Sequence, residues 1–136
     1  MKRICVRGIV LKDNKLAVIF RRKINEGIVK EYYAIPGGGV ERDEDLETAL
    51  KRELKEELNI EVNIKGLLFK TEQEDRIEYF YNCEYLSGTF ELVGEEKERN
   101  TKNNYYEPTF IPMDNINKFE LQKEVKEYFN KIYDNK

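Results

Sequence analysis

The chain has 136 residues, of which 40% are hydrophobic and 38% charged, and its net charge is −3. This length and composition suit one domain over residues 1–136 with a buried core. The absence of histidine excludes Ser–His and Cys–His catalysis and His-ligated zinc, and the lack of a basic excess argues against an extended nucleic-acid partner.

The cysteines and the N-terminus bear on location. Cys5 and Cys83 are the only cysteines and form no CxxC pair, so we expect two reduced thiols. The N-terminus lacks the long apolar run and cleavage site of a signal peptide, and no segment has the length of a membrane span. We therefore expect a cytoplasmic protein with no membrane partner.

Strand-like segments open the chain. Apolar and β-branched residues predict strands over Arg3–Leu11 and Lys15–Arg22, and the Asp-Asn pair between them predicts a hairpin. Ile28–Ile35 is again strand-like. Pro36 and the three glycines after it then break the chain, and glycines allow a close backbone approach to a ligand.

The next segment, Asp45–Leu58, has a helical pattern. Asp45 is a plausible N-cap, and Asn59 suits the left-handed conformation in which many helices end. The apolar residues recur at spacings of three and four: Leu46, Ala49, Leu50, Leu54 and Leu58.

The second half returns to strands and ends in a helix. Strands are predicted over Ile60–Phe69, Arg76–Leu86 and Tyr105–Pro112, with an exposed loop at Gly94–Asn104. A second amphipathic helix is predicted over Leu121–Tyr133. Its apolar stripe comprises Leu121, Val125, Phe129 and Ile132. This order predicts a mixed β-sheet and an α/β or α+β fold.

Two acids lie on the apolar side of the first helix. At about 100° per residue, Glu53 and Glu57 fall within the arc of Leu46 and Leu50, and Glu56 flanks them. Paired carboxylates facing a core need a compensating cation, and oxygen ligands favour Mg²⁺ or, alternatively, Mn²⁺. The competing interpretation is that this end of the helix emerges into solvent.

The spacing of these residues extends back to the glycines. Gly38 is followed after five residues by Glu44, and after seven more by the run RELKEELNI from Arg52 to Ile60. This pattern resembles the motif of the Nudix (MutT-like) hydrolase family, with Asn59 in place of the last glycine. The family also often has Trp at the position of Tyr33.

The resemblance implies a fold and a reaction. The fold is an α/β/α sandwich, with a mixed sheet between helices. The reaction is Mg²⁺-dependent hydrolysis of a phosphoanhydride bond in a nucleoside diphosphate linked to another group, such as a nucleoside triphosphate, ADP-ribose or a nucleotide sugar. Such proteins often pair, so a homodimer is a further expectation.

The resemblance also implies roles for individual residues. In several family members the residue that matches Glu53 serves as general base, which implies the same role for Glu53. Arg52 is expected to orient Glu53, and Glu44 or Glu41 to hold either Arg52 or a water molecule. The metal ligands implied are Glu53, Glu56, Glu57 and the Gly37 carbonyl.

Substrate contacts are less defined by the sequence. Arg22, next to Arg21 at a strand end, can meet phosphate, Tyr33 can stack on a base, and Gly38 can approach the ligand; an exposed strand end and a core tyrosine are the alternatives. In some family members an acid from a later loop assists, and here Glu95, Glu96 and Glu98 are candidates, with a solvated loop as the alternative.

Two other functions share this motif. One is a regulatory module that senses a nucleotide without turnover, although such modules typically lose the acids that are present here. The other is an RNA 5′-end pyrophosphohydrolase, which needs a basic surface and fits a pI of about 5.3 poorly.

Overall fold

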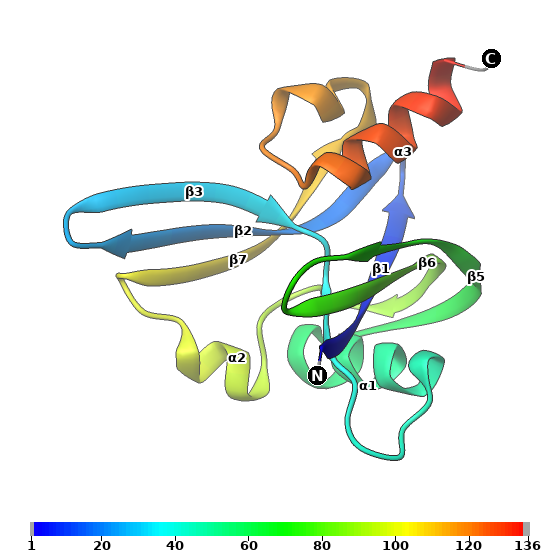
Figure 1. Cartoon of the computed structure of the whole chain (residues 1–136), viewed down its shortest axis with the longest axis horizontal. Helices are drawn as coiled ribbons and strands as arrows, with labels where there is room; N and C mark the ends of the chain where they lie inside the picture. Colours follow the sequence, from blue (N-terminus) through cyan, green and yellow to red (C-terminus); the bar gives the residue numbers. More distant parts are fainter. Residues whose placement is uncertain (1, 135–136) are drawn as a thin grey trace.

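A mixed β-sheet forms the centre of the computed structural model (Figure 1), which describes residues 2–134 and all of their side chains except those of residues 95, 96, 133 and 134. The strands are β1 (Arg3–Lys12), β2 (Lys15–Asn25), β3 (Ile28–Ala34), β4 (Gly37–Gly39), β5 (Ile60–Glu72), β6 (Arg76–Gly88) and β7 (Asn104–Pro112). The helices are α1 (Leu46–Leu58), α2 (Gly94–Arg99), the 3₁₀ helix η1 (Met113–Lys118) and α3 (Lys123–Asp134).

The strand order explains why the sheet is mixed. The main path is β3-β2-β1-β6-β5, with β4 paired to β1 and β7 paired to β2. The β1–β6 pair is parallel and the other pairs are antiparallel. β1 and β2 pair only at Leu11–Leu16 and Lys12–Lys15, and they then separate, so that β2, β3 and β7 extend away from β1 (Figure 1).

Each face of the sheet is covered by a different helix, as the predicted sandwich requires. On one face Val6 and Val10 of β1 pack in a core with Leu50 and Leu54 of α1. On the other face Ile9 of β1 packs in a second core with side chains from α3. Because neighbouring residues of a strand point to opposite faces, β1 contributes to both cores.

Local signals define both ends of α1. The Asp45 side chain accepts a hydrogen bond from the Thr48 backbone N–H at 2.8 Å, which supplies one of the partners that the first turn of a helix lacks. Asn59 has φ 56° and ψ 40°, and its N–H donates to the carbonyls of Leu54 and Lys55. Both cap predictions are confirmed. Asn59 takes the left-handed conformation at the position where the motif has its last glycine.

The predicted loop over Gly94–Asn104 is wrong in part, because Gly94–Arg99 forms helix α2. A single charged turn has no apolar periodicity that a sequence pattern could reveal. Tertiary contacts place it instead: the N–H groups of Glu91 and Val93 donate to the Leu58 and Glu57 carbonyls at the end of α1. These bonds set α2 beside the C-terminal acids of α1.

Three other predictions need correction. The glycines 37–39 pair with β1 as strand β4 rather than only breaking the chain. The last helix begins at Lys123, not Leu121, although Leu121, Val125 and Phe129 are buried as expected. Ile132 remains 40% exposed, since the end of α3 extends past the core.

Two further expectations concern the thiols and the membrane. Cys5 and Cys83 are free and buried, and burial raises the pKa of Cys83 to about 12. Among residues 2–134, no helix is long and apolar enough to cross a membrane.

Candidate active site

The glycines of β4 lie directly against the acids of α1. A Cβ atom at Gly38 would lie 2.4 Å from Glu53 Cδ, and one at Gly37, where φ is 155°, would lie 1.9 Å from the Val6 carbonyl oxygen. A side chain at position 37 would collide with the backbone of β1, and one at position 38 would displace the Glu53 carboxylate. The glycines therefore allow strand β4 to pair with β1 while the Glu53 carboxylate lies over it.

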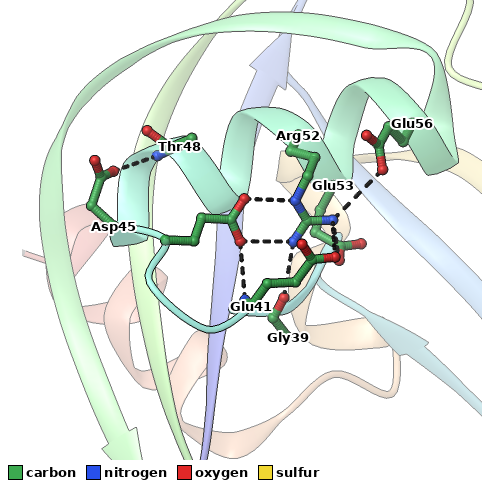
Figure 2. A network of polar contacts seen from close by, with 8 residues as sticks. Gly39, Glu41, Asp45, Thr48, Arg52, Glu53 and Glu56 are labelled. Atoms are coloured by element: carbon green, nitrogen blue, oxygen red, sulfur yellow. Dashed lines mark hydrogen bonds and ion pairs between the residues drawn. The ribbon is translucent and has the colours of Figure 1, made fainter.

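Arg52 organises the carboxylates around this contact, as Figure 2 shows. Its Nε and Nη2 donate to the two oxygens of Glu44 at 2.7 and 2.9 Å, and Nη2 also donates to the Gly39 carbonyl at 3.2 Å. Its Nη1 donates to Glu53 Oε1 at 3.1 Å. The expectations that Glu44 holds Arg52 and that Arg52 contacts Glu53 therefore agree with the geometry.

Two more exposed acids surround the same guanidinium. Glu41 Oε1 and Glu56 Oε2 each lie 3.6 Å from Arg52 Nη1, and these carboxylates are 70% and 60% exposed. Glu53 is only 17% exposed. On helix α1 the guanidinium of Arg52 thus contacts one half-buried acid, Glu53, and one exposed acid, Glu56.

The electrostatics of the pair match its geometry. The hydrogen bond from Arg52 holds the pKa of Glu44 below its ordinary value, assisted by the backbone N–H of Glu41. The hydrogen bond to Glu44 in turn raises the pKa of Arg52, with Glu53 adding to this effect. Both groups stay charged across the physiological range.

The acids share one cavity of about 680 Å³. Its lining includes Glu53, Glu56 and Glu57 of α1, the glycines of β4 and Gly94 of α2. The wheel prediction that Glu53 and Glu57 turn toward the core side is confirmed, since both are half-buried while Glu47 and Lys51 are exposed.

This donor set suits a hard divalent cation, because it consists of carboxylates beside backbone carbonyls. As the side chains are oriented, however, no three acids among the described residues converge to hold a metal ion. Glu53 faces Arg52, and Glu56 extends outward. The three acids lie on one helix and line one cavity, so their side-chain rotamers determine how far apart the carboxylates are.

The predicted substrate residues lie on different faces. Arg22 pairs with Glu31 at 2.8 Å, whereas its neighbour Arg21 lines a cavity that adjoins the acids, since adjacent strand residues point to opposite sides. Tyr33 packs between Phe20 and Phe119, with ring centroids at 5.3 and 5.2 Å.

The three predicted extra acids all belong to α2. Glu98 is exposed. The side chains of Glu95 and Glu96 lie outside the described part of the structure, so their contribution stays a prediction. From this region the described residues Gly94 and Arg99 line the acid cavity.

Sequence reasoning did not identify Arg3, Arg7 and Glu78 as neighbours of this region. Glu78 is 2% exposed and receives a hydrogen bond from Arg7 Nε at 3.0 Å. The strand Arg76–Leu86 contains two acids, Glu78 and Glu84, and the sequence pattern does not indicate which of them is buried with a partner.

Comparisons with known proteins agree with this architecture. The family model described as "NUDIX domain" matches residues 1–131. An ADP-ribose pyrophosphatase of Methanocaldococcus jannaschii is 32% identical over 133 residues, covering 92% of this chain and 72% of that protein.

Solved structures show the same fold at lower identity. The MutT NUDIX hydrolase of Burkholderia pseudomallei superposes with a TM-score of 0.71 at 19% identity, covering 96% of this chain and 97% of that one. A UDP-X diphosphatase superposes with a TM-score of 0.67 at 19% identity, covering 99% of this chain and 64% of that one.

Proposed function

This chain belongs to the Nudix hydrolase family, and from that premise we propose that it hydrolyses the phosphoanhydride bond of a nucleoside diphosphate linked to another group, with Mg²⁺ as the cofactor and Mn²⁺ as its substitute. One observation carries the proposal: Glu53, Glu56 and Glu57 line a single cavity against β4, and Arg52 is fixed between Glu44 and Glu53.

The three acids of α1 would hold the cation, together with the Gly37 carbonyl. When bound, the cation supplies neutralisation of phosphate charge and activation of a water molecule. Glu53 is the proposed proton acceptor, because it is the acid that Arg52 orients and that Gly38 admits into the cavity. Glu44 acts indirectly, by keeping the Arg52 side chain in place.

ADP-ribose is the first substrate to test. The M. jannaschii relative is named for ADP-ribose, and the structural neighbour UDP-X diphosphatase is named for UDP-X. The two cavities beside the acids have volumes of about 680 and 250 Å³, and together they are of the size that small-molecule ligands occupy. Arg22, Tyr33 and Gly38 stay proposed contacts, and Arg21 joins them because it lines the adjoining cavity.

The test is a metal-dependent substrate screen. Wild type is incubated with Mg²⁺ and ADP-ribose, nucleotide sugars, nucleoside triphosphates or dinucleoside polyphosphates, and phosphate-containing products are quantified. Glu53→Gln should lower kcat at least ~10²-fold, the scale of acid–base and metal contributions. Glu47→Gln is the matched control, because Glu47 lies on the exposed face of the same helix.

Three results would contradict the proposal. Equal turnover by wild type and Glu53→Gln would show that the acids of α1 are not the site. Turnover that persists undiminished in EDTA would contradict the proposed role of a divalent cation. Tight nucleotide binding without any hydrolysis across the panel would favour the regulatory alternative.

A further inference from the structure

A cationic groove extends away from the acids. The acid cavity adjoins a second cavity of about 250 Å³, and both are lined by Arg3, Gly37, Gly38, Glu57 and Arg99. A third cavity, of about 560 Å³, continues from the second and shares with it Arg3, Cys5, Arg7, Arg21, Ala34 and Ile35. We call the part of the second and third cavities that is lined by Arg3, Arg7, Arg21 and Arg76 the arginine groove.

The charge of this groove is opposite to that of the whole chain. The charged side chains that line the second cavity are four arginines and one acid, Glu57. The third cavity has six basic residues and three acids in its lining. In a chain of net charge −3, this local excess of cations favours an anionic ligand.

Arg7 is held in the groove by a buried carboxylate. Glu78 Oε2 accepts from Arg7 Nε at 3.0 Å. Glu78 Oε1 accepts from Thr71, Gln73 and Gln122 at 3.1, 3.3 and 3.1 Å. With these bonds Glu78 is occupied as an acceptor, so it serves to position Arg7. Nη1 and Nη2 of Arg7 have no hydrogen-bond partner among the described residues.

Two other guanidinium groups leave a donor unused. The Nε atoms of Arg21 and Arg76 are buried and make no hydrogen bond within the described part of the chain. Both arginines line the third cavity. The Arg76 Nε lies 3.8 Å from Glu78 Oε1, beyond hydrogen-bond distance. A buried N–H without an acceptor is unfavourable, so the hydrogen-bonding capacity of these two guanidinium groups is not fully used within the described residues.

The arginine groove and the acids lie on opposite faces of the β1–β4 pair. Glu53 covers Gly38, which is paired with Val6, and Val6 belongs to the core under α1. Arg7 follows Val6 in β1 and therefore points to the opposite face. This is the face of Ile9, which belongs to the core under α3. The side chains of Glu53 and Arg7 therefore lie on opposite faces of this strand pair, and the second cavity, which both Arg7 and Glu57 line, connects the two faces.

The opening between the two faces is also present. β1 and β2 separate beyond the Leu11–Leu16 pair. The second cavity is lined by Gly37 and Gly38 of β4 and also by Arg21 of β2. A ligand can thus pass around the edge of β4, with one end at the acids and the other in the arginine groove.

We propose that the arginine groove binds a phosphomonoester that the substrate carries apart from the anhydride to be cleaved, with Glu78 positioning Arg7 for it. This inference rests on the proposed hydrolase function, and it narrows the substrate class to nucleoside diphosphate derivatives with an additional terminal phosphate.

The test uses ligand pairs that differ by one phosphate and conditions in which hydrolysis is absent. Calorimetry in EDTA compares ADP-ribose 2′-phosphate with ADP-ribose, and coenzyme A with dephospho-coenzyme A. In at least one pair, the phosphorylated member should bind wild type about tenfold more tightly or better, as charge-assisted hydrogen bonds to arginine predict.

Substitutions in the arginine groove test whether the groove causes the preference for the phosphorylated ligand. Arg7→Gln and Arg21→Gln should each reduce the preference, and Glu78→Gln should reduce it while leaving the affinity for the unphosphorylated member unchanged. Lys51→Gln, a loss of positive charge on the exposed face of α1, should retain it. Thermal unfolding of each variant checks that the fold is kept.

Equal affinity within both pairs, no measurable binding, or a preference that survives both Arg7→Gln and Arg21→Gln would overturn the inference. These results do not depend on turnover. A preference in EDTA without hydrolysis in the Mg²⁺ screen would contradict only the proposed function, and hydrolysis without the preference would contradict only this inference.

Discussion

Arg52 forms a bidentate pair with Glu44, donating hydrogen bonds from Nε to Oε2 at 2.7 Å and from Nη2 to Oε1 at 2.9 Å. The two residues are eight positions apart, one in the loop before α1 and the other in its middle. The contact leaves Arg52 Nη1 directed at Glu53. Glu44 does not line the acid cavity, yet by holding Arg52 it helps to determine where the proposed base, Glu53, lies.

Replacing Arg52 with lysine tests this role. Lysine keeps the charge but cannot form the planar fork, so Glu44 and Glu53 would no longer be held together. We expect kcat/KM to fall by roughly 10–100-fold, the usual effect of residues that orient metal ligands. Arg42→Lys, at an exposed position, should leave kcat/KM unchanged; a similar loss in both variants would contradict the prediction.

Gly38 is expected to be required for activity more than for stability. A Cβ at this position would lie 2.4 Å from Glu53 Cδ, and the movable Glu53 side chain would be displaced before the backbone. Gly38→Ala should therefore lower kcat by about 10²-fold, the scale of a small misplacement. Gly66→Ala, where a Cβ meets nothing within 4 Å, is the control, and thermal unfolding midpoints should show that both variants fold.

Asn59 departs from the family motif, and its backbone explains why this is tolerated. With φ at 56°, Asn59→Gly should be more stable than Asn59→Ala by about 1 kcal/mol, because alanine is strained in the left-handed region. Both variants lose the bond from Asn59 Nδ2 to Thr89, so the comparison isolates the backbone. Urea unfolding measures it, and equal stabilities would refute the strain argument.

Glu78 should make stability depend on pH. Burial by itself raises the pKa of Glu78, but Arg7, Gln122 and Arg76 outweigh burial and hold that pKa below the ordinary 4.5. A lowered carboxyl pKa stabilises the fold above the unfolded-state value, and this contribution is lost as pH falls through the folded-state value. Glu78→Gln should therefore unfold more easily than wild type at neutral pH, by about 3 kcal/mol.

The difference between wild type and Glu78→Gln should then shrink as the pH is lowered below 4.5. Urea unfolding at neutral pH and at successively lower pH values measures this convergence. Glu84→Gln, an exposed acid on the same strand, should show little difference from wild type throughout. A gap that stays constant with pH would mean that the charge of Glu78 does not stabilise the fold.

Much of the candidate site could be predicted because its elements are local. The limits of α1 follow from Asp45 and Asn59, and its inward acids follow from helical spacing alone. The face of Arg21 and Arg22 could not be chosen in the same way, because an alternating strand reveals two faces but not which of them borders the cavity.

The sequence by itself determined the helix α1, its caps, the spacing of Arg52 and the acids, and the family to which they point, because these depend on residues within a few turns of one another. Only the tertiary structure decided the placement of α2 and the arginine groove. Arg7 and Glu78 are 71 positions apart, and Gln122 lies a further 44 beyond Glu78. The parallel pairing of β1 with β6 brings Arg7 and Glu78 together, and no local pattern encodes that register.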